Sequence, residues 1–260
     1  MNRISVFVLL LVVSMCPSPA WSEDAELSVL FASKGLDGTI VISSLDDRRS
    51  HIHNERRAKE TFVPASTFKI LNTLIALEEK AVANENEIIK WDGKEKEYPE
   101  WNRDHTLETA FKASCVWCFQ ELARRVGGNK YQQYLQKTGY GNLHGQLTET
   151  TFWLDGTLTI DSISQVDFLK KIYRKELPFS PLSYETLRKV MVTEQTPVYT
   201  LRAKTGWAER VRPQTGWYVG YVETQKDVWL FATNVEVRSG KDLPYRQQIT
   251  REALKLKGII

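Results

Sequence analysis

The sequence predicts an α+β fold in which a central antiparallel sheet is built from strands near the two ends of the chain. β-branched and aromatic runs occur at residues 38–43 near the start, and at residues 199–202, 216–222 and 228–234 in the last third. Helical patterns lie between them, and no internal repeat or linker divides the chain. This order favours one sheet flanked by helices, with a helical lobe beside it.

The chain begins with a pattern typical of a secretory signal peptide. A basic start is followed by an apolar run over residues 4–13, and residues 20–22 (Ala-Trp-Ser) place small side chains two positions apart. We predict residues 1–22 to be a signal peptide and residues 23–260 to be one periplasmic catalytic domain. No apolar run approaches the roughly 20 residues that a membrane helix needs, so we expect no stable membrane association. A lipoprotein anchored through Cys16 is the weaker alternative, because Met15 is large for a lipid-attachment site.

Two strand patterns follow, over residues 27–31 and 38–43, with turn residues between them. We therefore expect them to pair as a hairpin. Pro64 then begins a helix over residues 65–77, since proline suits a first helical turn. Apolar residues cover almost the whole circumference of this helix, so it should be buried.

The middle of the chain is mainly helical. Residues 84–112 are polar and aromatic and are expected to form an excursion between helices. We predict a sheet subdomain over about residues 23–60 and 195–260, and a helical subdomain over about residues 61–194. The predicted helices cover residues 114–126, 131–137, 164–174, 184–191 and 246–256.

Composition and charge exclude several classes of protein. With 35 Lys and Arg against 32 Asp and Glu, the net charge is only +3, and no block of five like charges occurs, so we expect no nucleic-acid partner. The absence of a biased tract argues against disordered, collagenous and coiled-coil proteins. The three cysteines are too few for a disulfide framework. For Cys115 and Cys118 we expect two buried thiols rather than an intrahelical disulfide or a redox pair.

Three short motifs occur in order: Ser66-x-x-Lys69, Ser114-x-Val116 and Lys204-Thr205-Gly206. At i and i+3 of a helix, Ser66 and Lys69 lie on one face, so the amine can reach the hydroxyl. A buried lysine with a lowered pKa can take the serine proton and make the hydroxyl a nucleophile. The alternative for this pair is an N-terminal serine beside a lysine that extends its amine to solvent.

The sequence Lys-Thr-Gly occurs twice. The copy at residues 137–139 ends a helix, and we assign it to a C-cap without chemistry. The copy at residues 204–206 should lie on a sheet edge facing the buried helix. There Gly206 lets a substrate backbone approach closely, while Lys204 and Thr205 offer a cation and a hydroxyl to an acidic substrate.

In this order, the motifs resemble those of the penicillin-recognising serine acyl-transferases, which handle β-lactams. Further segments narrow the resemblance to the class D (oxacillinase-type) β-lactamases, across essentially all of the mature chain. The absence of Ser-Asp-Asn argues against class A. The resemblance implies a penicillin-binding-protein/β-lactamase-like fold. The matching segments are residues 64–69 (Pro-Ala-Ser-Thr-Phe-Lys), 140–142 (Tyr-Gly-Asn), 152–156 (Phe-Trp-Leu-Asp-Gly), 202–207 and 216–220.

The resemblance also implies a role for each matching residue. Ser66 is the expected acyl-ester nucleophile, and Lys69, carboxylated by carbon dioxide to N6-carboxylysine, is the expected general base. Trp153 is expected to hydrogen-bond this carbamate, with Val116 and Leu154 packed over it.

The remaining roles concern the proton relay and the substrate. Ser114 and Lys204 should pass a proton toward the lactam nitrogen. The substrate carboxylate is expected on Thr205 and Arg246. The substrate should also lie against Gly206 and Trp207, with an oxyanion hole formed by the backbone N–H groups of Ser66 and Trp207.

The resemblance implies no metal and no organic cofactor, with carbon dioxide or bicarbonate needed only to carboxylate Lys69. His51-x-His53 hints at a metal-dependent hydrolase, but no acidic-histidine continuation and no clustered third ligand follow it. The expected partners are small-molecule β-lactam antibiotics. The oligomeric state stays open between a monomer and a homodimer.

We therefore expect hydrolysis of penicillins, with cephalosporins as further candidates and antibiotic resistance as the result. Carbapenem hydrolysis is a hypothesis, because the eight-residue loop over residues 208–215 resembles that of a carbapenem-hydrolysing subgroup. The alternatives are a β-lactam sensor or a penicillin-binding transpeptidase, which acylate without turnover. Either would be expected with membrane spans or further domains, whereas here the domain follows a cleavable signal.

Overall fold

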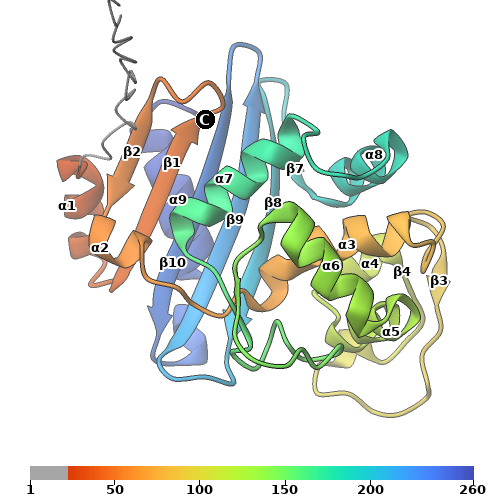
Figure 1. The fold of residues 1–260 in the computed structure, drawn as a ribbon. Helices are drawn as coiled ribbons and strands as arrows, with labels where there is room; N and C mark the ends of the chain where they lie inside the picture. The colour runs from red at the N-terminus through yellow and green to blue at the C-terminus, as the bar shows by residue number, and fades with distance from the viewer. Residues whose placement is uncertain (1–22) are drawn as a thin grey trace, which may run out of the picture.

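The computed structural model describes residues 23–260, so the predicted signal peptide lies outside the described residues. Six strands form the central sheet: β1 (Gly38–Ser44), β2 (Ser50–His53), β7 (Val192–Gln195), β8 (Tyr199–Ala208), β9 (Gln214–Thr224) and β10 (Val228–Val237). Their order is β2-β1-β10-β9-β8-β7, and all neighbours are antiparallel (Figure 1). The predicted fold class is confirmed, because β1 from the start of the chain pairs with β10 from its end.

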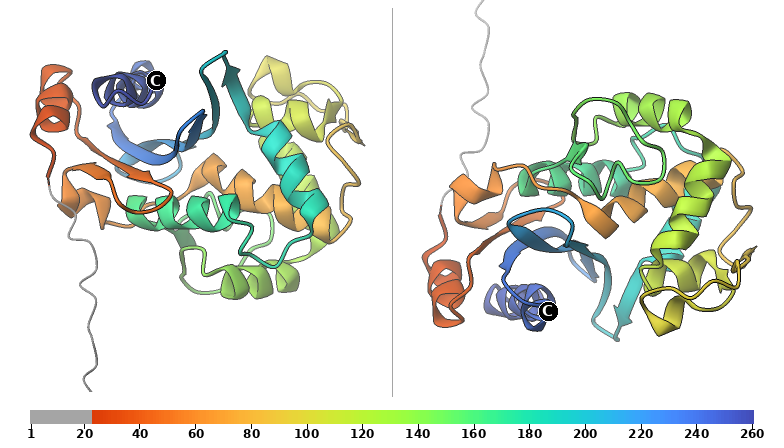
Figure 2. Two further views of the ribbon diagram at one scale, coloured as in Figure 1. Left: turned by 90° about the horizontal axis from the view of Figure 1, so that it is seen from above. Right: turned by 90° about the horizontal axis from the view of Figure 1, so that it is seen from below.

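Helices cover both faces of this sheet. α1 (Ala25–Ser33) and α9 (Tyr245–Leu256) lie on one face, and α3 (Lys69–Glu78) and α7 (Ser162–Tyr173) lie on the other (Figure 2). Side chains of β9 alternate between the two cores, as a strand buried on both faces requires. Trp217, Val219 and Tyr221 belong to the larger core with α3 and α7, whereas Tyr218 and Val222 belong to the smaller core with α1 and α9.

A helical lobe lies beside the sheet and contains α3, α4 (Leu107–Lys112), α5 (Val116–Val126), α6 (Gly128–Thr138) and α8 (Pro181–Val190) (Figure 1). The predicted burial of the first of these helices is confirmed, since residues 69–77 of α3 are all buried. Gly139 adopts the left-handed conformation (φ 63°) after α6, as expected of a C-cap. Within residues 23–260 no helix is long and apolar enough to cross a membrane.

The excursion over residues 84–112 contains short elements: β3 (Ile88–Ile89), a 3₁₀ turn (Pro99–Trp101), β4 (His105–Thr106) and α4. Two other short strands, β5 (Asn142–Leu143) and β6 (Leu158–Thr159), pair with each other. The remaining elements are α2 (Glu55–Ala58) and 3₁₀ turns at Ala65–Phe68 and Gly240–Asp242.

The strand predicted over residues 27–31 is wrong, because this segment belongs to α1. Leu27 and Phe31 are four residues apart and both buried, so they share the face of α1 that packs toward the smaller core. Asp24 caps the helix by accepting hydrogen bonds from two N–H groups of its first turn. An apolar run of five residues fits the periodicity of a strand as well as that of a helix. The N-cap at Asp24 favours the helix. The N-terminal hairpin is instead formed by β1 and β2.

One expectation about the last third agrees with the structure, and another is corrected. β7 pairs only with residues 200–202 of β8, so residues 204–206 lie at an open edge of the sheet, as expected. The loop predicted over residues 208–215 is shorter, because Ala208 and Thr215 pair across β8 and β9 and leave residues 209–213 as the connection.

Candidate active site

The segment before α3 makes a sharp turn directly before Ser66. Ala65 has a φ of 47°, a left-handed conformation that residues other than glycine rarely adopt. Two hydrogen bonds hold the turn: the Thr67 hydroxyl donates to the Pro64 carbonyl at 2.8 Å, and the indole N–H of Trp217 donates to the Val63 carbonyl at 2.9 Å. Strained backbone of this kind is typical of functional sites, where the surrounding structure maintains it.

Ser66 and Lys69 meet as the helical spacing predicts. Lys69 Nζ donates a hydrogen bond to Ser66 Oγ at 2.8 Å. The lysine is fully buried, and within residues 23–260 no carboxylate forms an ion pair with it. Because burial penalises the ammonium form, the pKa of Lys69 falls from 10.5 to about 7. Near neutral pH this amine is therefore available as a base or as a nucleophile.

Trp153 lies within the aromatic core around α3. Its ring stacks on Phe68, with ring centroids 5.5 Å apart. Among the described residues, its buried indole N–H has no hydrogen-bond partner. A buried donor of this kind is costly, so it marks a place where an acceptor fits.

A second serine and lysine pair joins the helical lobe to the sheet. Lys204 Nζ on β8 donates a hydrogen bond to Ser114 Oγ at 2.8 Å. Burial, followed by the positive charges of Lys69 and Arg246, holds the pKa of Lys204 well below its usual value. Ser114 itself has a φ of 55°, so the second serine also lies in strained backbone.

Arg246, at the start of α9, lies against the same strand. Its Nη1 donates a hydrogen bond to the Gly206 carbonyl at 2.9 Å, and burial lowers its pKa to about 10. Gly206 is tightly enclosed, because a Cβ atom there would lie 3.0 Å from both the Pro64 carbonyl and the Thr67 methyl group. A side chain at this position would therefore require the strand or the nucleophile turn to shift by a few tenths of an ångström.

An open cleft brings most of the predicted site residues together. Lys69, Lys204 and Trp153 are buried beneath it, so they border the site without lining it. The predicted residues that line the cleft are Ser66, Ser114, Val116, Leu154, Thr205, Gly206, Trp207 and Arg246.

One wall of this cleft was not predicted from the sequence. Tyr98, Glu100 and Trp101 line it from the segment that was expected to be only an excursion. Glu209 and Arg210, from the connection between β8 and β9, line it as well. The aromatic residues in an otherwise polar segment were the available signal, since exposed loops rarely need large rings.

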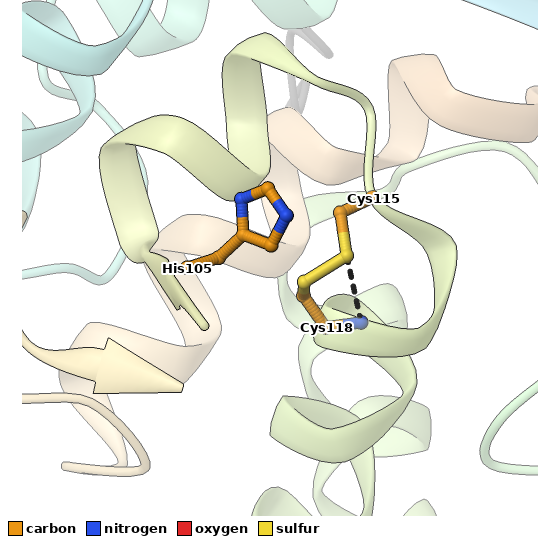
Figure 3. A group of neighbouring side chains, drawn as sticks. All are labelled: His105, Cys115 and Cys118. Atoms are coloured by element: carbon orange, nitrogen blue, oxygen red, sulfur yellow. Dashed lines mark hydrogen bonds between the residues drawn. A yellow bond between two sulfur atoms is a disulfide. The ribbon is translucent and has the colours of Figure 1, made fainter. Parts of the chain in front are cut away.

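The expectation of two buried thiols is wrong, because Cys115 and Cys118 form a disulfide (Figure 3). The prediction placed both residues inside one helix that begins at residue 114. The helix begins at Val116, and Cys115 is its N-cap with non-helical dihedral angles. This places the two Cα atoms 5.5 Å apart, within the range that a disulfide spans.

The two histidines of His51-x-His53 lie on β2, where each binds a different carboxylate. His51 Nδ1 lies 2.9 Å from Asp24 Oδ2, and His53 Nδ1 lies 3.0 Å from Glu23 Oε1. Neither histidine lines the cleft. They connect the start of the described chain to the edge of the sheet.

Comparison with known proteins places the chain in a family. The family profile of the penicillin binding protein transpeptidase domain matches residues 40–255. The Beta-lactamase OXA-48 of Klebsiella pneumoniae is 38% identical, and the alignment covers 100% of both chains.

Solved structures agree with this relationship. The class D β-lactamase YbXI from Nostoc is 40% identical, with a TM-score of 0.88 over 90% of this chain and 99% of that chain. The class D β-lactamase FUS-1 from Fusobacterium nucleatum is 36% identical, with a TM-score of 0.89 over 92% and 100% of the two chains. Sequence, fold and the cleft with its serine and lysine pairs lead to the same conclusion: this chain belongs to the class D β-lactamases.

Proposed function

We propose that this chain hydrolyses the β-lactam ring of penicillins through an acyl-enzyme on Ser66, with carboxylated Lys69 as the general base. The observation that carries the proposal is the buried Lys69 Nζ, which lies 2.8 Å from Ser66 Oγ and has a pKa of about 7. An amine that is largely neutral at physiological pH can react with carbon dioxide. An exposed lysine, protonated at that pH, reacts far less.

The carbamate forms when the lysine nitrogen attacks the carbon of carbon dioxide and loses a proton. The product is an anion in the place of a buried cation, next to the nucleophile. The unpartnered indole N–H of Trp153 supports this step, because it supplies a hydrogen bond that a buried anion needs. No metal or organic cofactor is needed for this chemistry.

In acylation, the carbamate accepts the Ser66 proton while Ser66 Oγ attacks the lactam carbonyl. The backbone N–H groups of Ser66 and Trp207 stabilise the oxyanion. The C–N bond of the lactam then breaks, and Lys204 passes a proton through Ser114 to the leaving nitrogen. The hydrogen bond between Lys204 and Ser114 supports this relay.

The substrate carboxylate binds to Thr205 and Arg246 beside the nucleophile. Both residues line the cleft, and Arg246 Nε is a buried donor without a partner among the described residues. An anionic substrate satisfies this donor and compensates part of the positive charge that depresses the pKa of Lys204.

Before deacylation the carbamate releases the Ser66 proton, which replaces the proton that Lys204 gave to the lactam nitrogen. The carbamate then takes a proton from water, the hydroxide attacks the acyl carbonyl, and this proton returns to Ser66 Oγ as the ester bond breaks. This step separates a hydrolase from a sensor or a transpeptidase, which hold the acyl group. We place this activity in the periplasm, with residues 23–260 as one catalytic domain. Carbapenems are included in the proposed spectrum because residues 208–215 resemble the corresponding segment of a carbapenem-hydrolysing subgroup. Glu209 and Arg210 of this segment line the cleft, where they can contact the substrate.

The decisive experiment measures hydrolysis of the chromogenic cephalosporin nitrocefin with and without bicarbonate, for the wild-type protein and Lys69→Ala. We expect turnover that bicarbonate increases in the wild-type protein and no bicarbonate response in the variant. Stoichiometric acylation without turnover would favour the sensor function instead. Failure to hydrolyse any carbapenem while penicillins are hydrolysed would remove the carbapenem part alone.

A further inference from the structure

We propose that the Cys115–Cys118 disulfide is a positioning element of the active site, which holds Ser114 in reach of Lys204. The proposal rests on the proposed function, in which Ser114 relays a proton to the substrate. Ser114 precedes the bridge directly in the chain, and Val116, which also lines the cleft, lies inside it. The bridge therefore constrains the short segment that presents both side chains to the substrate.

The conformation of Ser114 requires support. Its φ of 55° lies in the left-handed region, which is unfavourable for a residue other than glycine. Two backbone hydrogen bonds hold the turn: Ser114 N–H donates to the Phe111 carbonyl at 3.2 Å, and Cys115 N–H donates to the Ala110 carbonyl at 2.9 Å. The two hydrogen bonds connect the turn to the residues before Ser114. The disulfide constrains the residues directly after it, where α5 begins.

The same turn carries the cleft wall that the sequence analysis missed. The Trp101 indole N–H donates to the Ala113 carbonyl at 3.0 Å, just before Ser114. Inside the bridge, the Trp117 indole N–H donates to the Trp101 carbonyl at 2.9 Å. Trp101 is therefore attached on both sides of Ser114. Loss of the bridge would loosen the relay serine and this wall together.

The side chain of His105 lies next to the disulfide (Figure 3). Metal ions are usually bound by histidine, cysteine, aspartate or glutamate side chains. Among the described residues, the only cluster of three such side chains close enough to hold an ion is His105, Cys115 and Cys118. In the disulfide the two sulfur atoms are bonded to each other, so they do not offer the thiolates that a metal requires. The His105 nitrogens also have partners, Glu100 O at 3.0 Å and Thr109 Oγ1 at 3.2 Å. This arrangement favours a structural role for the disulfide rather than metal binding.

If the disulfide positions Ser114, its loss should change the kinetic constants in a specific way. Thr205 lies on β8 and Arg246 lies on α9, so the groups that bind the substrate carboxylate do not depend on the bridge. Without it, we expect KM to stay within about twofold, because ground-state binding is retained. We expect kcat to fall about tenfold or more, because a relay group displaced by a fraction of an ångström loses its alignment.

Two single variants test this proposal, and each removes the bridge in a different way. Cys115→Ser keeps an N-cap side chain that can accept the Cys118 N–H, which Cys115 Sγ now accepts at 3.3 Å. Cys118→Ala keeps Cys115 as the cap. If both variants show the same loss of kcat, the bridge is the cause and the cap is not.

All values are expressed per active site, titrated with a phosphonate that forms a stable covalent ester with Ser66 Oγ, so that partly unfolded protein does not imitate the defect. The wild-type protein is also treated with dithiothreitol, whose two thiols become a disulfide as their hydrogens pass to Cys115 and Cys118. We expect the reduced enzyme to match the variants, and both variants to be insensitive to the reductant.

Ser114→Ala separates the two levels of the proposal. If Ser114→Ala retains full kcat, the proposed role of Ser114 fails and the positioning role fails with it. If Ser114→Ala loses kcat but both cysteine variants retain wild-type kcat per titrated site, only the positioning role of the disulfide is overturned.

Discussion

The two serine and lysine pairs share one distance, but different forces produce it. In each pair the lysine Nζ lies 2.8 Å from the serine Oγ, and in each the lysine is buried with a lowered pKa. Ser66 lies in the 3₁₀ turn Ala65–Phe68, and Lys69 begins α3 three residues later, so local helical geometry brings them together. Ser114 and Lys204 are 90 residues apart and meet only because the helical lobe packs against β8.

The electrostatic origin of the two shifts also differs. Burial alone lowers the pKa of Lys69, whereas Lys204 also responds to the positive charges of Lys69 and Arg246. Carboxylation of Lys69 would replace one of these cations with an anion and so raise the pKa of Lys204. Lys69 is therefore suited to react with carbon dioxide because it is shielded from solvent. Lys204 is suited to proton transfer because its pKa responds to the charges of neighbouring residues.

The largest effect is expected for Lys69→Met, which breaks the local pair while filling its buried volume. We expect kcat for nitrocefin to fall by about 10³ or more, because one group serves both acylation and deacylation. Any acyl-enzyme that still forms should persist, which intact-protein mass spectrometry after penicillin addition would detect. Turnover within tenfold of wild type would contradict the role of Lys69 as the base.

A smaller loss is expected for Lys204→Met, which breaks the long-range pair. We expect kcat to fall by about 10², because a relay acid assists only the departure of the lactam nitrogen. Acylation should slow while deacylation stays near the wild-type rate, as stopped-flow burst kinetics would resolve. Accumulation of acyl-enzyme, as in Lys69→Met, would mean that the two lysines do not have separate roles.

The pH dependence of activity should distinguish the two lysines further. Lys69 must be neutral to react with carbon dioxide, and its pKa is about 7. In bicarbonate-poor buffer we therefore expect kcat to decline as the pH falls through about 7, since the protonated fraction grows. Added bicarbonate should restore activity at pH 6.5 more than at pH 8. Equal stimulation at both values would count against the carbamate.

Trp153→Phe tests the environment of the first pair with a more modest change. The phenyl ring keeps an aromatic partner for Phe68 but removes the indole N–H. Loss of one charge-assisted hydrogen bond costs about 1.5–3 kcal/mol, so we expect roughly 10- to 100-fold more bicarbonate to be needed for half-maximal activation. A titration with bicarbonate measures this directly. Trp207→Phe, which changes a cleft tryptophan outside this core, should show no comparable shift.

The smallest expected effect is on stability. The pKa of Lys69 in the folded protein, about 7, lies below its unfolded value of 10.5, so the unfolded chain binds more protons between these values. The free energy of unfolding therefore rises with pH from about 7 toward 10.5 in carbon-dioxide-free buffer. We expect Lys69→Met to show a shallower rise in urea unfolding at pH 7 and pH 9. Identical slopes would indicate that Lys69 is not buried as the neutral amine.

Much of the site could be predicted because its parts are local. Pro64 and the apolar circumference of the following segment indicated a buried helix, and the i and i+3 spacing then placed Ser66 against Lys69. The resemblance to class D β-lactamases supplied the other site positions, and seven of them line one cleft together with Ser66. Ser66-x-x-Lys69 and Ser114-x-Val116 lie where helices begin, whereas Lys204-Thr205-Gly206 lies within β8.

The incorrect predictions concern short segments whose sequence is compatible with two local conformations. Residues 27–31 fit a strand as well as a helix until the Asp24 cap and packing against the sheet select the helix. The cysteines were treated as part of one helix, but the helix begins one residue after Cys115, and this difference permits the disulfide. Helix boundaries are set by capping and by the packing of neighbouring turns, which a hydrophobic pattern does not encode.

By itself, the sequence determined the fold class, the buried helix and the pair formed by Ser66 and Lys69. Only the tertiary structure decided that Lys204 meets Ser114, that Trp101 forms a cleft wall, and that Cys115 is bonded to Cys118. The physical reason is the range of the interactions involved. Helical spacing and strand alternation act over a few residues, whereas these contacts depend on how the helical lobe packs against the sheet and on where a strained turn ends.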